Sequence, residues 1–196
     1  MSEIIRAVEL IRPQVEFVYF DLGGVVFNFS GGIQAISERL QAPENEISAM
    51  WRRYDDAICR GDLHPQEFWE ILNNSFGTFV ELDFLTFWMD HFSPIDSTHQ
   101  AMRELSSSGM NVGILSNIYP GVYEKALERG VIPDLPYSAV IRSCEVGLVK
   151  PDPQIFHYAA ETSGYRAQQI LLIDDRSENI QGADAAGWNS FQFVQE

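Results

Sequence analysis

The sequence predicts an α/β fold: a Rossmann-like parallel-sheet core with an all-helical cap subdomain inserted after the first strand. Short, nearly continuous apolar runs alternate with amphipathic segments through most of the chain, which is the pattern of right-handed βαβ units. The block 31–91 has helical periodicity and no strand pattern. Polar side chains suited to catalysis follow the apolar runs, at the edge where open parallel sheets bind ligands.

The expected strands are apolar runs bounded by turn residues. The first, 15–20, is followed by Asp21, Leu22, Gly23 and Gly24, as expected for a buried parallel strand that ends in a glycine turn. Further strands are expected at 112–115, 139–141, 170–173 and 190–194. Helices are expected between them at 98–105, 121–128, 154–161 and 178–186, because a proline or a capping side chain stands near the start of each.

The block 31–91 is predicted to be entirely helical. Apolar residues at i, i+3, i+4, i+7 and i+11 mark one face of a helix: Ile47, Met50, Trp51, Tyr54 and Ile58. A second helix is expected over 68–76 after Pro65, and Asp83 is expected to cap a third that runs to Trp88. We therefore expect residues 1–30 and 92–196 to form the core, and residues 31–91 to form the cap.

Composition excludes several classes of partner. The 196 residues include 13 Lys+Arg and 28 Asp+Glu, for a net charge of −15. Such a chain is unsuited to neutralising nucleic-acid phosphates or to binding an anionic membrane. No run approaches the roughly 18 apolar residues of a membrane span, and residues 1–14 lack a signal-peptide layout. We expect a cytoplasmic protein with no nucleic-acid or membrane partner, while the sequence leaves the oligomeric state open.

Four groups of polar residues follow the expected strands: Asp21, Ser116-Asn117, Lys150 and Asp174-Asp175. Taken singly, each has an ordinary structural explanation, because Asp, Ser and Asn are common in turns and at helix starts. Their order along the chain, each after a predicted strand, indicates a shared active site instead.

The segments that contain these residues resemble a known family. They are 18–26 (VYFDLGGVV), 113–117 (GILSN), 147–156 (GLVKPDPQIF) and 171–180 (LLIDDRSENI). In this order they resemble the four motifs of the haloacid dehalogenase (HAD) superfamily of aspartate-nucleophile hydrolases, and the helical block stands where that superfamily carries a small helical cap. The resemblance is closest to a branch of bacterial sugar-phosphate phosphatases that has Asp-Leu-Gly in the first motif.

The resemblance implies roles for the residues that handle a phosphoryl group. Asp21 would be the nucleophile that forms an aspartyl-phosphate, which divides one difficult displacement into two steps. Ser116 and the adjacent backbone N–H of Asn117 would bind phosphate oxygens through hydrogen bonds. Lys150 would be both catalytic and substrate-binding, because its charge neutralises the phosphate and orients the carboxylates. The implied substrate is a small phosphorylated metabolite.

The resemblance also implies a magnesium site. A carboxylate that attacks a phosphate dianion is repelled by it, so a divalent cation is needed between them. Oxygen donors suit Mg²⁺, and the implied ligands are Asp21, the backbone carbonyl of Gly23, and Asp175, with Asp174 as a further candidate. Asn179 is expected to bond to the loop or to a water molecule.

Gly23 departs from the family pattern. Most phosphatases of this superfamily have a second Asp two residues after the nucleophile as general acid and base, a role typically contributing about 10²–10⁴-fold to the rate. We therefore expect a Mg²⁺-dependent phosphatase that favours good leaving groups, with sugar 1-phosphates among the candidates.

Two alternatives stay open. One is a metal-free hydrolase similar to 2-haloacid dehalogenases, and the other is a catalytically weak HAD-fold binding or regulatory protein. Arg52 and Arg53 are expected to be solvated, with pairing to nearby Asp55 and Asp56, or else to contact substrate from the cap.

Overall fold

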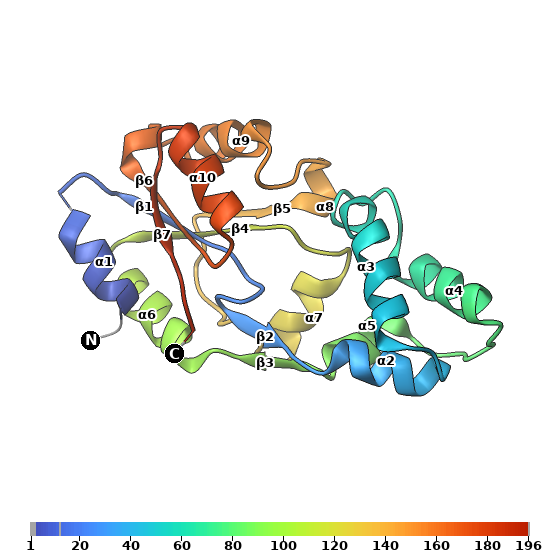
Figure 1. Ribbon diagram of the computed structural model, residues 1–196. Coiled ribbons are helices and arrows are strands. Elements are labelled where there is room, and N and C mark those ends of the chain that lie inside the picture. The colour runs from blue at the N-terminus through green and yellow to red at the C-terminus, as the bar shows by residue number, and fades with distance from the viewer. Residues whose placement is uncertain (1–2, 12, 196) are drawn as a thin grey trace.

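The computed structural model describes residues 3–11 and 13–195, and these form helical layers on both faces of a five-stranded parallel sheet (Figure 1). The strand order is β5-β4-β1-β6-β7. The strands are β1 (Phe17–Phe20), β4 (Asn111–Ser116), β5 (Ala139–Arg142), β6 (Ile170–Asp174) and β7 (Asn189–Gln192). The predicted fold class is confirmed. Arg12, and the outermost residues 1–2 and 196 of the predicted core range, lie outside the described residues.

The central strand β1 sets the position of the site. Its four residues are fully buried, as expected for a strand covered on both faces. Phe20 pairs with Ile114 of β4 and with Ile173 of β6. Because these parallel strands end close together, the residues that follow them lie at one edge of the sheet.

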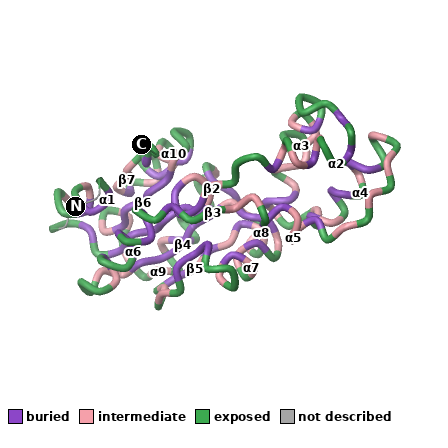
Figure 2. Tube along the Cα trace, turned by 90° about the horizontal axis from the view of Figure 1, so that it is seen from below, coloured by how far each residue is buried: buried purple, intermediate pink, exposed green. Residues whose placement is uncertain are grey.

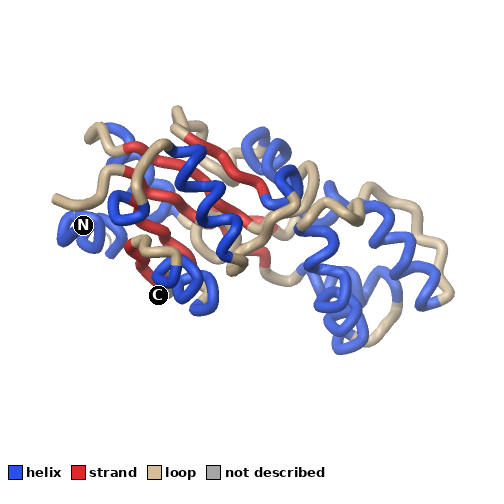
Figure 3. The backbone as a smooth tube through the Cα atoms, turned by 90° about the horizontal axis from the view of Figure 1, so that it is seen from above, coloured by secondary structure: helices blue, strands red, loops and turns tan. Residues whose placement is uncertain are grey.

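Helices cover the two faces of the sheet, and Figure 3 shows them packed against the strands. On one face, α9 (Pro153–Ser163) and α10 (Ser177–Ala185) pack on a core that includes Tyr19, Phe156 and Trp188. On the other face lie α1 (Glu3–Ile11), α6 (Asp96–Ser107) and α7 (Val122–Glu128). The helix α1 was not predicted. It buries Ile4, Ile5 and Val8 in the second core.

The helical insertion begins and ends at an antiparallel ribbon of β2 (Phe27–Phe29) and β3 (Phe92–Pro94). Between these strands lie α2 (Gly32–Leu40), α3 (Glu44–Cys59), α4 (Pro65–Phe76) and α5 (Phe84–Met89), which extend to one end of the molecule (Figures 1 and 2). The expected helical segments fall within α3, α4 and α5, whereas α2 and the ribbon were not predicted. The division into a core and a cap at residues 31–91 stays a prediction.

The starts of α4 and α5 are stabilised as their sequences indicate. Pro65 occupies the first turn of α4, and His64 and Glu67 form a reciprocal capping box before it. Asp83 caps α5 by accepting a hydrogen bond from the Thr86 N–H at 2.6 Å. That bond is also the main reason why the pKa of Asp83 lies below its usual value. Within the described residues, no helix is both long enough and apolar enough to cross a bilayer.

Candidate active site

The carboxyl edge of the sheet brings the predicted site residues together. Asp21 follows β1, Ser116 ends β4, and Asp174 ends β6 with Asp175 after it. The Asp21 N–H donates to the Ile173 carbonyl at 2.9 Å. This bond continues the β1–β6 pairing by one residue and holds the Asp21 backbone against β6.

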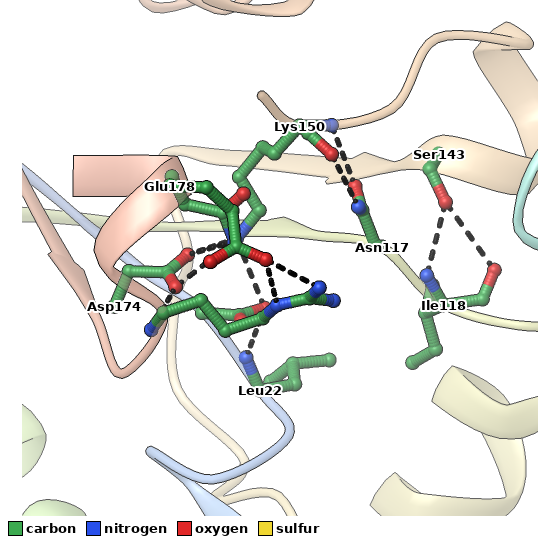
Figure 4. A network of polar contacts seen from close by, with 10 residues as sticks. Leu22, Asn117, Ile118, Ser143, Lys150, Asp174 and Glu178 are labelled. Carbon is green, nitrogen blue, oxygen red and sulfur yellow. Dashed lines mark hydrogen bonds and ion pairs between the residues drawn. The ribbon is translucent and has the colours of Figure 1, made fainter. Parts of the chain in front are cut away.

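Lys150 lies between two of the carboxylates. Its Nζ atom is 3.1 Å from Asp21 Oδ1 and 2.5 Å from Asp174 Oδ2, and its side chain is completely buried. Asn117 holds the Lys150 backbone through two hydrogen bonds of 2.8 Å, one donated to the Lys150 carbonyl and one accepted from the Lys150 N–H (Figure 4). The Asn117 side chain therefore positions the lysine.

Asp174 is almost fully occupied by protein donors. Besides Lys150, its carboxylate accepts hydrogen bonds from Asn179 Nδ2 at 3.0 and 3.1 Å and from the Arg176 N–H at 2.9 Å. The residue is completely buried. Asn179 thus bonds to a carboxylate, whereas the sequence suggested a loop or water partner. The arrangement makes Asp174 the anchor for Lys150.

Asp175 has a different environment. Among the described residues, its buried Oδ1 atom has no hydrogen-bond partner. Gly24 approaches its other oxygen with φ of +77°, and a Cβ atom on Gly24 would lie 2.4 Å from Asp175 Oδ2. Only glycine fits this backbone conformation and this close contact without strain. The loop after β1 is therefore packed directly against a carboxylate with a free oxygen.

These residues provide the donor set of a cation site. Asp21, Asp174 and Asp175 each offer an oxygen, and the three atoms lie within 4.8 Å of one another. Oxygen donors of this kind suit Mg²⁺, which takes one or two carboxylates and keeps several waters. A buried carboxylate oxygen with no donor is costly unless a cation or a water molecule binds it. The residues present therefore fit a divalent cation.

The electrostatics of the site favour the binding of a positive charge. Burial raises the pKa of Asp21 to about 6, although Lys150 opposes the shift, Asp174 adds to it, and a hydrogen bond with Ser116 lowers it. Burial, and then Asp174, also raise the pKa of Asp175. Burial tends to lower the pKa of Lys150, but Asp174 and Asp21 outweigh it and the pKa is raised. Lys150 is therefore a permanent cation here.

Phe29 covers Gly23, the position at which the resemblance implies a second aspartate. A Cβ atom on Gly23 would lie 3.0 Å from Phe29 Cε1. The ring thus lies over the backbone of Gly23, from which the missing side chain would extend.

A cavity of about 320 Å³ joins the carboxylates to the helical insertion. Its polar end includes Asp21, Ser116, Asn117, Asp175 and Asn179. Much of the remaining lining is aromatic: Phe27, Phe29, Trp51, Trp88, Phe92 and Tyr119. No local sequence pattern indicates this aromatic lining, because its residues are scattered along the chain.

The insertion contributes one charged group to the cavity, Asp55 of α3. Its carboxylate accepts a hydrogen bond from the Tyr119 hydroxyl on the loop after β4. Burial, and then Asp55, raise the pKa of Tyr119 well above its usual value, so the hydroxyl keeps its proton. Arg52 and Arg53 are exposed and do not contribute to the lining of this cavity. Asp56 pairs with Arg60 at 2.8 Å, which corrects the expected pairing of these aspartates with Arg52 and Arg53.

Ser143 joins the insertion to the loop after β4, which begins at Asn117. Its hydroxyl donates to the Cys59 carbonyl at 2.6 Å. It also accepts from the Ile118 N–H at 2.9 Å (Figure 4). Ser143 is completely buried. No local pattern indicates this contact, since a single serine at the start of a short helix, α8 (Ser143–Val146), is not distinctive.

Comparisons with known proteins define the family. A family model described as haloacid dehalogenase-like hydrolase matches residues 15–187. The chain belongs to this family of hydrolases. Phosphatase MT3486 of Mycobacterium tuberculosis (strain CDC 1551 / Oshkosh) is 24% identical over 192 residues, which cover 90% of this chain and 86% of that protein. (S)-2-haloacid dehalogenase 1 of Pseudomonas sp. (strain CBS-3) is 22% identical over 184 residues, which cover 87% of this chain and 81% of that protein.

A solved structure shows the same fold. It is the HAD family enzyme BT-2542 of Bacteroides thetaiotaomicron in complex with magnesium and inorganic phosphate, with a TM-score of 0.76, 20% identity, and coverage of 91% of this chain and 93% of that one. The predicted family and the prediction of a hydrolase are confirmed. The phosphatase among the relatives supports the predicted class of phosphoric monoester hydrolase. The clustered carboxylates and the magnesium-bound neighbour support Mg²⁺ as the cofactor.

Proposed function

We propose that this protein is a Mg²⁺-dependent phosphatase of small phosphorylated metabolites that acts through an aspartyl-phosphate on Asp21. The observation that carries the proposal is that Asp21 and Asp175 lie close together and line one cavity, while a buried oxygen of Asp175 has no partner among the described residues. The phosphatase relative and the neighbour that holds magnesium and phosphate support it.

The residues of the chain divide the reaction between them. A carboxylate oxygen of Asp21 attacks phosphorus, and the bond to the leaving oxygen breaks with its electron pair on that oxygen. Water then attacks the phosphorus of the aspartyl-phosphate, which releases inorganic phosphate and restores Asp21. Lys150 neutralises phosphate charge, while the Ser116 hydroxyl and the Asn117 backbone N–H bind its oxygens.

Asp21, Asp175 and the carbonyl of Gly23 would hold the cation. When bound, it offsets the repulsion between the nucleophile and the phosphate. Asp174 was also a candidate ligand, but its contacts with Lys150 and Asn179 favour a positioning role. It keeps the lysine ammonium beside Asp21.

Residues 31–91 are proposed to act as a cap that closes the cavity. Trp51, Asp55, Cys59 and Trp88 of this segment line the cavity, so it shapes the space beside the carboxylates. Gly23 offers no side chain to protonate a leaving group, which supports a preference for leaving groups that depart as anions. Sugar 1-phosphates are one class with this property.

Among the relatives, the haloacid dehalogenase provides the rival function. A metal-free dehalogenase gives no role to Asp175, whose buried oxygen has no partner among the described residues, so the phosphatase is favoured. A catalytically weak binding protein is disfavoured for the same reason, because a cluster of repelling carboxylates is costly to keep without a function.

The test uses acetyl phosphate, which has a good leaving group and needs no general acid. We expect hydrolysis that requires Mg²⁺, stops with EDTA, and is lost in Asp21→Asn. Asp62→Asn is the matched control, because Asp62 is exposed and does not line the cavity. Metal-independent release of halide from 2-chloropropionate, without hydrolysis of acetyl phosphate, would establish the rival function.

A further inference from the structure

We infer that the preferred substrates are aryl phosphates, monoesters of a small phenol whose ring binds against the aromatic side of the cavity. The inference rests on the proposed phosphatase activity and names its substrate class. Three features support it: a continuous aromatic surface, a missing acid beside it, and a scarcity of free polar groups at that end of the cavity.

The aromatic side of the cavity is one connected surface, which we call the aromatic wall: Phe27, Phe29, Trp51, Trp88, Phe92 and Tyr119. Ring centroids lie 4.8 Å apart for Phe27 and Phe92, and 5.9 Å apart for Phe29 and Phe92. Trp88 lies 6.2 Å from Phe29 and 4.4 Å from Trp51, and Trp51 is stacked on Tyr119 at 6.0 Å. Such spacings suit offset or edge-to-face contacts, which a bound aromatic ring would extend.

The wall reaches the reacting end of the cavity. Phe29 lies over Gly23, two residues after the nucleophile, and Tyr119 lies three residues after Ser116. In an in-line displacement the leaving oxygen departs opposite the attacking oxygen of Asp21. Asp21 and the wall line one cavity, so a ring attached to the leaving oxygen is within reach of the wall.

The missing acid selects the same kind of leaving group. Where the resemblance implies an aspartate, this chain has Gly23 covered by a ring, so the leaving oxygen departs without a proton from that position. Phenols have a pKa of about 10, whereas water, a guide to simple alcohols, has a pKa of about 16. A phenolate therefore leaves far more readily without protonation than the alkoxide of an aliphatic alcohol.

Few polar side chains lie beside the wall, and two of them are partly engaged by protein partners. The Asp55 carboxylate accepts from Tyr119, and the Arg176 guanidinium donates to Glu178 at 2.9 and 2.5 Å. A sugar would bury several hydroxyls here, and each needs a hydrogen-bond partner to avoid a desolvation cost. The volume of about 320 Å³ is also at the small end of the range for ligand sites, which suits a phosphate with one small ring.

The reaction balances with water alone. The Asp21 oxygen forms a bond to phosphorus while the bond from phosphorus to the phenolic oxygen breaks, and the phenolate leaves with the electron pair. It takes a proton from solvent. Water then hydrolyses the aspartyl-phosphate, so the products are a phenol and inorganic phosphate.

The first test compares four substrates of the wild-type protein with Mg²⁺: phenyl, cyclohexyl and acetyl phosphate, and glucose 1-phosphate. We expect kcat/KM for phenyl phosphate to exceed those for cyclohexyl phosphate and glucose 1-phosphate by about tenfold or more. If acetyl phosphate is hydrolysed but glucose 1-phosphate equals or exceeds phenyl phosphate, the aryl preference is wrong and the phosphatase stands. If none of the four is hydrolysed, both proposals are refuted.

The second test removes one ring from the wall. Phe29 is 51% exposed, so Phe29→Leu removes contact with substrate without opening the core. We expect the ratio of kcat/KM for phenyl phosphate to that for acetyl phosphate to fall about 3- to 10-fold. Phe79→Leu is the matched control, because Phe79 is 92% exposed and does not line the cavity, and this ratio should not change.

A binding measurement separates recognition from leaving-group reactivity. Phenylphosphonate has a phosphorus–carbon bond that cannot be hydrolysed, and we expect it to inhibit acetyl phosphate hydrolysis at least about tenfold more strongly than methylphosphonate. Phe29→Leu should reduce this difference. Equal inhibition by the two phosphonates in the wild type would refute binding of the ring against the wall.

Discussion

Replacing Asp21 by asparagine should make the metal-free protein more stable while it abolishes activity. The pKa of Asp21 is raised from 3.8 to about 6, mainly by burial, so the native state retains its proton at pH values where the unfolded chain has lost it. The contribution of the Asp21 carboxyl to the free energy of unfolding is therefore greatest below about pH 4, and it is lost as the pH rises through about 6. At pH 7 the ionised carboxylate costs about 3 kcal/mol, at about 1.4 kcal/mol for each pH unit.

Asparagine removes that charge and leaves an amide oxygen for the bond that Asp21 Oδ1 accepts from the Leu22 N–H at 2.7 Å. Lys150 stays paired with Asp174, so the substitution does not leave a buried cation alone. We expect a gain of up to about 3 kcal/mol in the free energy of unfolding at pH 7 with EDTA. For a urea dependence of about 2 kcal/mol per molar, the unfolding midpoint rises by about 1.5 M.

Asp174→Asn is the contrasting variant. Asp174 is held by Lys150, Asn179 and the Arg176 N–H, and breaking a buried ion pair on one side typically costs about 3–5 kcal/mol. We expect this variant to unfold at lower urea than the wild type, although it also removes one negative charge from the cluster.

The assay is urea unfolding followed by tryptophan fluorescence, with EDTA and with Mg²⁺. Added Mg²⁺ should stabilise the wild type, since a ligand that binds only the native state raises its stability, and it should stabilise Asp21→Asn far less. If Asp21→Asn is less stable than the wild type in EDTA, the electrostatic account of the cluster is wrong. Equal stabilisation of the two proteins by Mg²⁺ would contradict Asp21 as a ligand.

Three further predictions concern other positions. Gly24→Ala places a Cβ atom 2.4 Å from Asp175 Oδ2 and should raise the Mg²⁺ concentration that gives half-maximal activity. Gly77→Ala is the control for the backbone cost of about 1–2 kcal/mol, because Gly77 has a similar φ of +64° and nothing within 4 Å. Equal Mg²⁺ requirements in the two variants would contradict a role of Asp175 in binding the metal. Ser143→Ala should lower the free energy of unfolding by about 1–3 kcal/mol, because two buried backbone groups lose their partner; an unchanged thermal midpoint would contradict this. Burial lowers the pKa of His99. As the pH falls below 6.5 the unfolded chain therefore takes up a proton before the native protein does, and the free energy of unfolding decreases. In urea unfolding, His99→Leu should lose less stability than the wild type between pH 7.5 and 5.5, and identical losses would contradict a neutral, buried His99.

The sequence was most informative where one strand or one helix face determined the structure. The runs that became β1, β4 and β6 are short and apolar, and each of these strands is followed by a polar residue at the carboxyl edge. The ribbon was missed because strands of three residues are too short to show alternation. The helix α2 was missed because Gly31 at its start makes no side-chain cap.

The order of the motifs along the chain was enough to identify the residues of the candidate site, but it did not show which of them are in contact. Asp21 and Lys150 were found because both belong to ordered motifs, and the structure places them 3.1 Å apart. The Tyr119–Asp55 bond joins segments 64 residues apart in sequence. It depends on where α3 lies relative to the loop after β4, which no local pattern encodes. The placement of Phe29 over Gly23 likewise depends on the bend of the chain into the ribbon.

The antiparallel pairing of Phe29 with Phe92 has a consequence for protein engineering. The two chain ends of the helical segment lie side by side, so a tight turn of two residues joining position 29 to position 92 would convert the ribbon into a hairpin. Such a shortened chain would keep the sheet order and the carboxylates but lose Trp51 and Trp88. Comparing it with the full protein would separate phosphoryl chemistry from choice of substrate within one polypeptide.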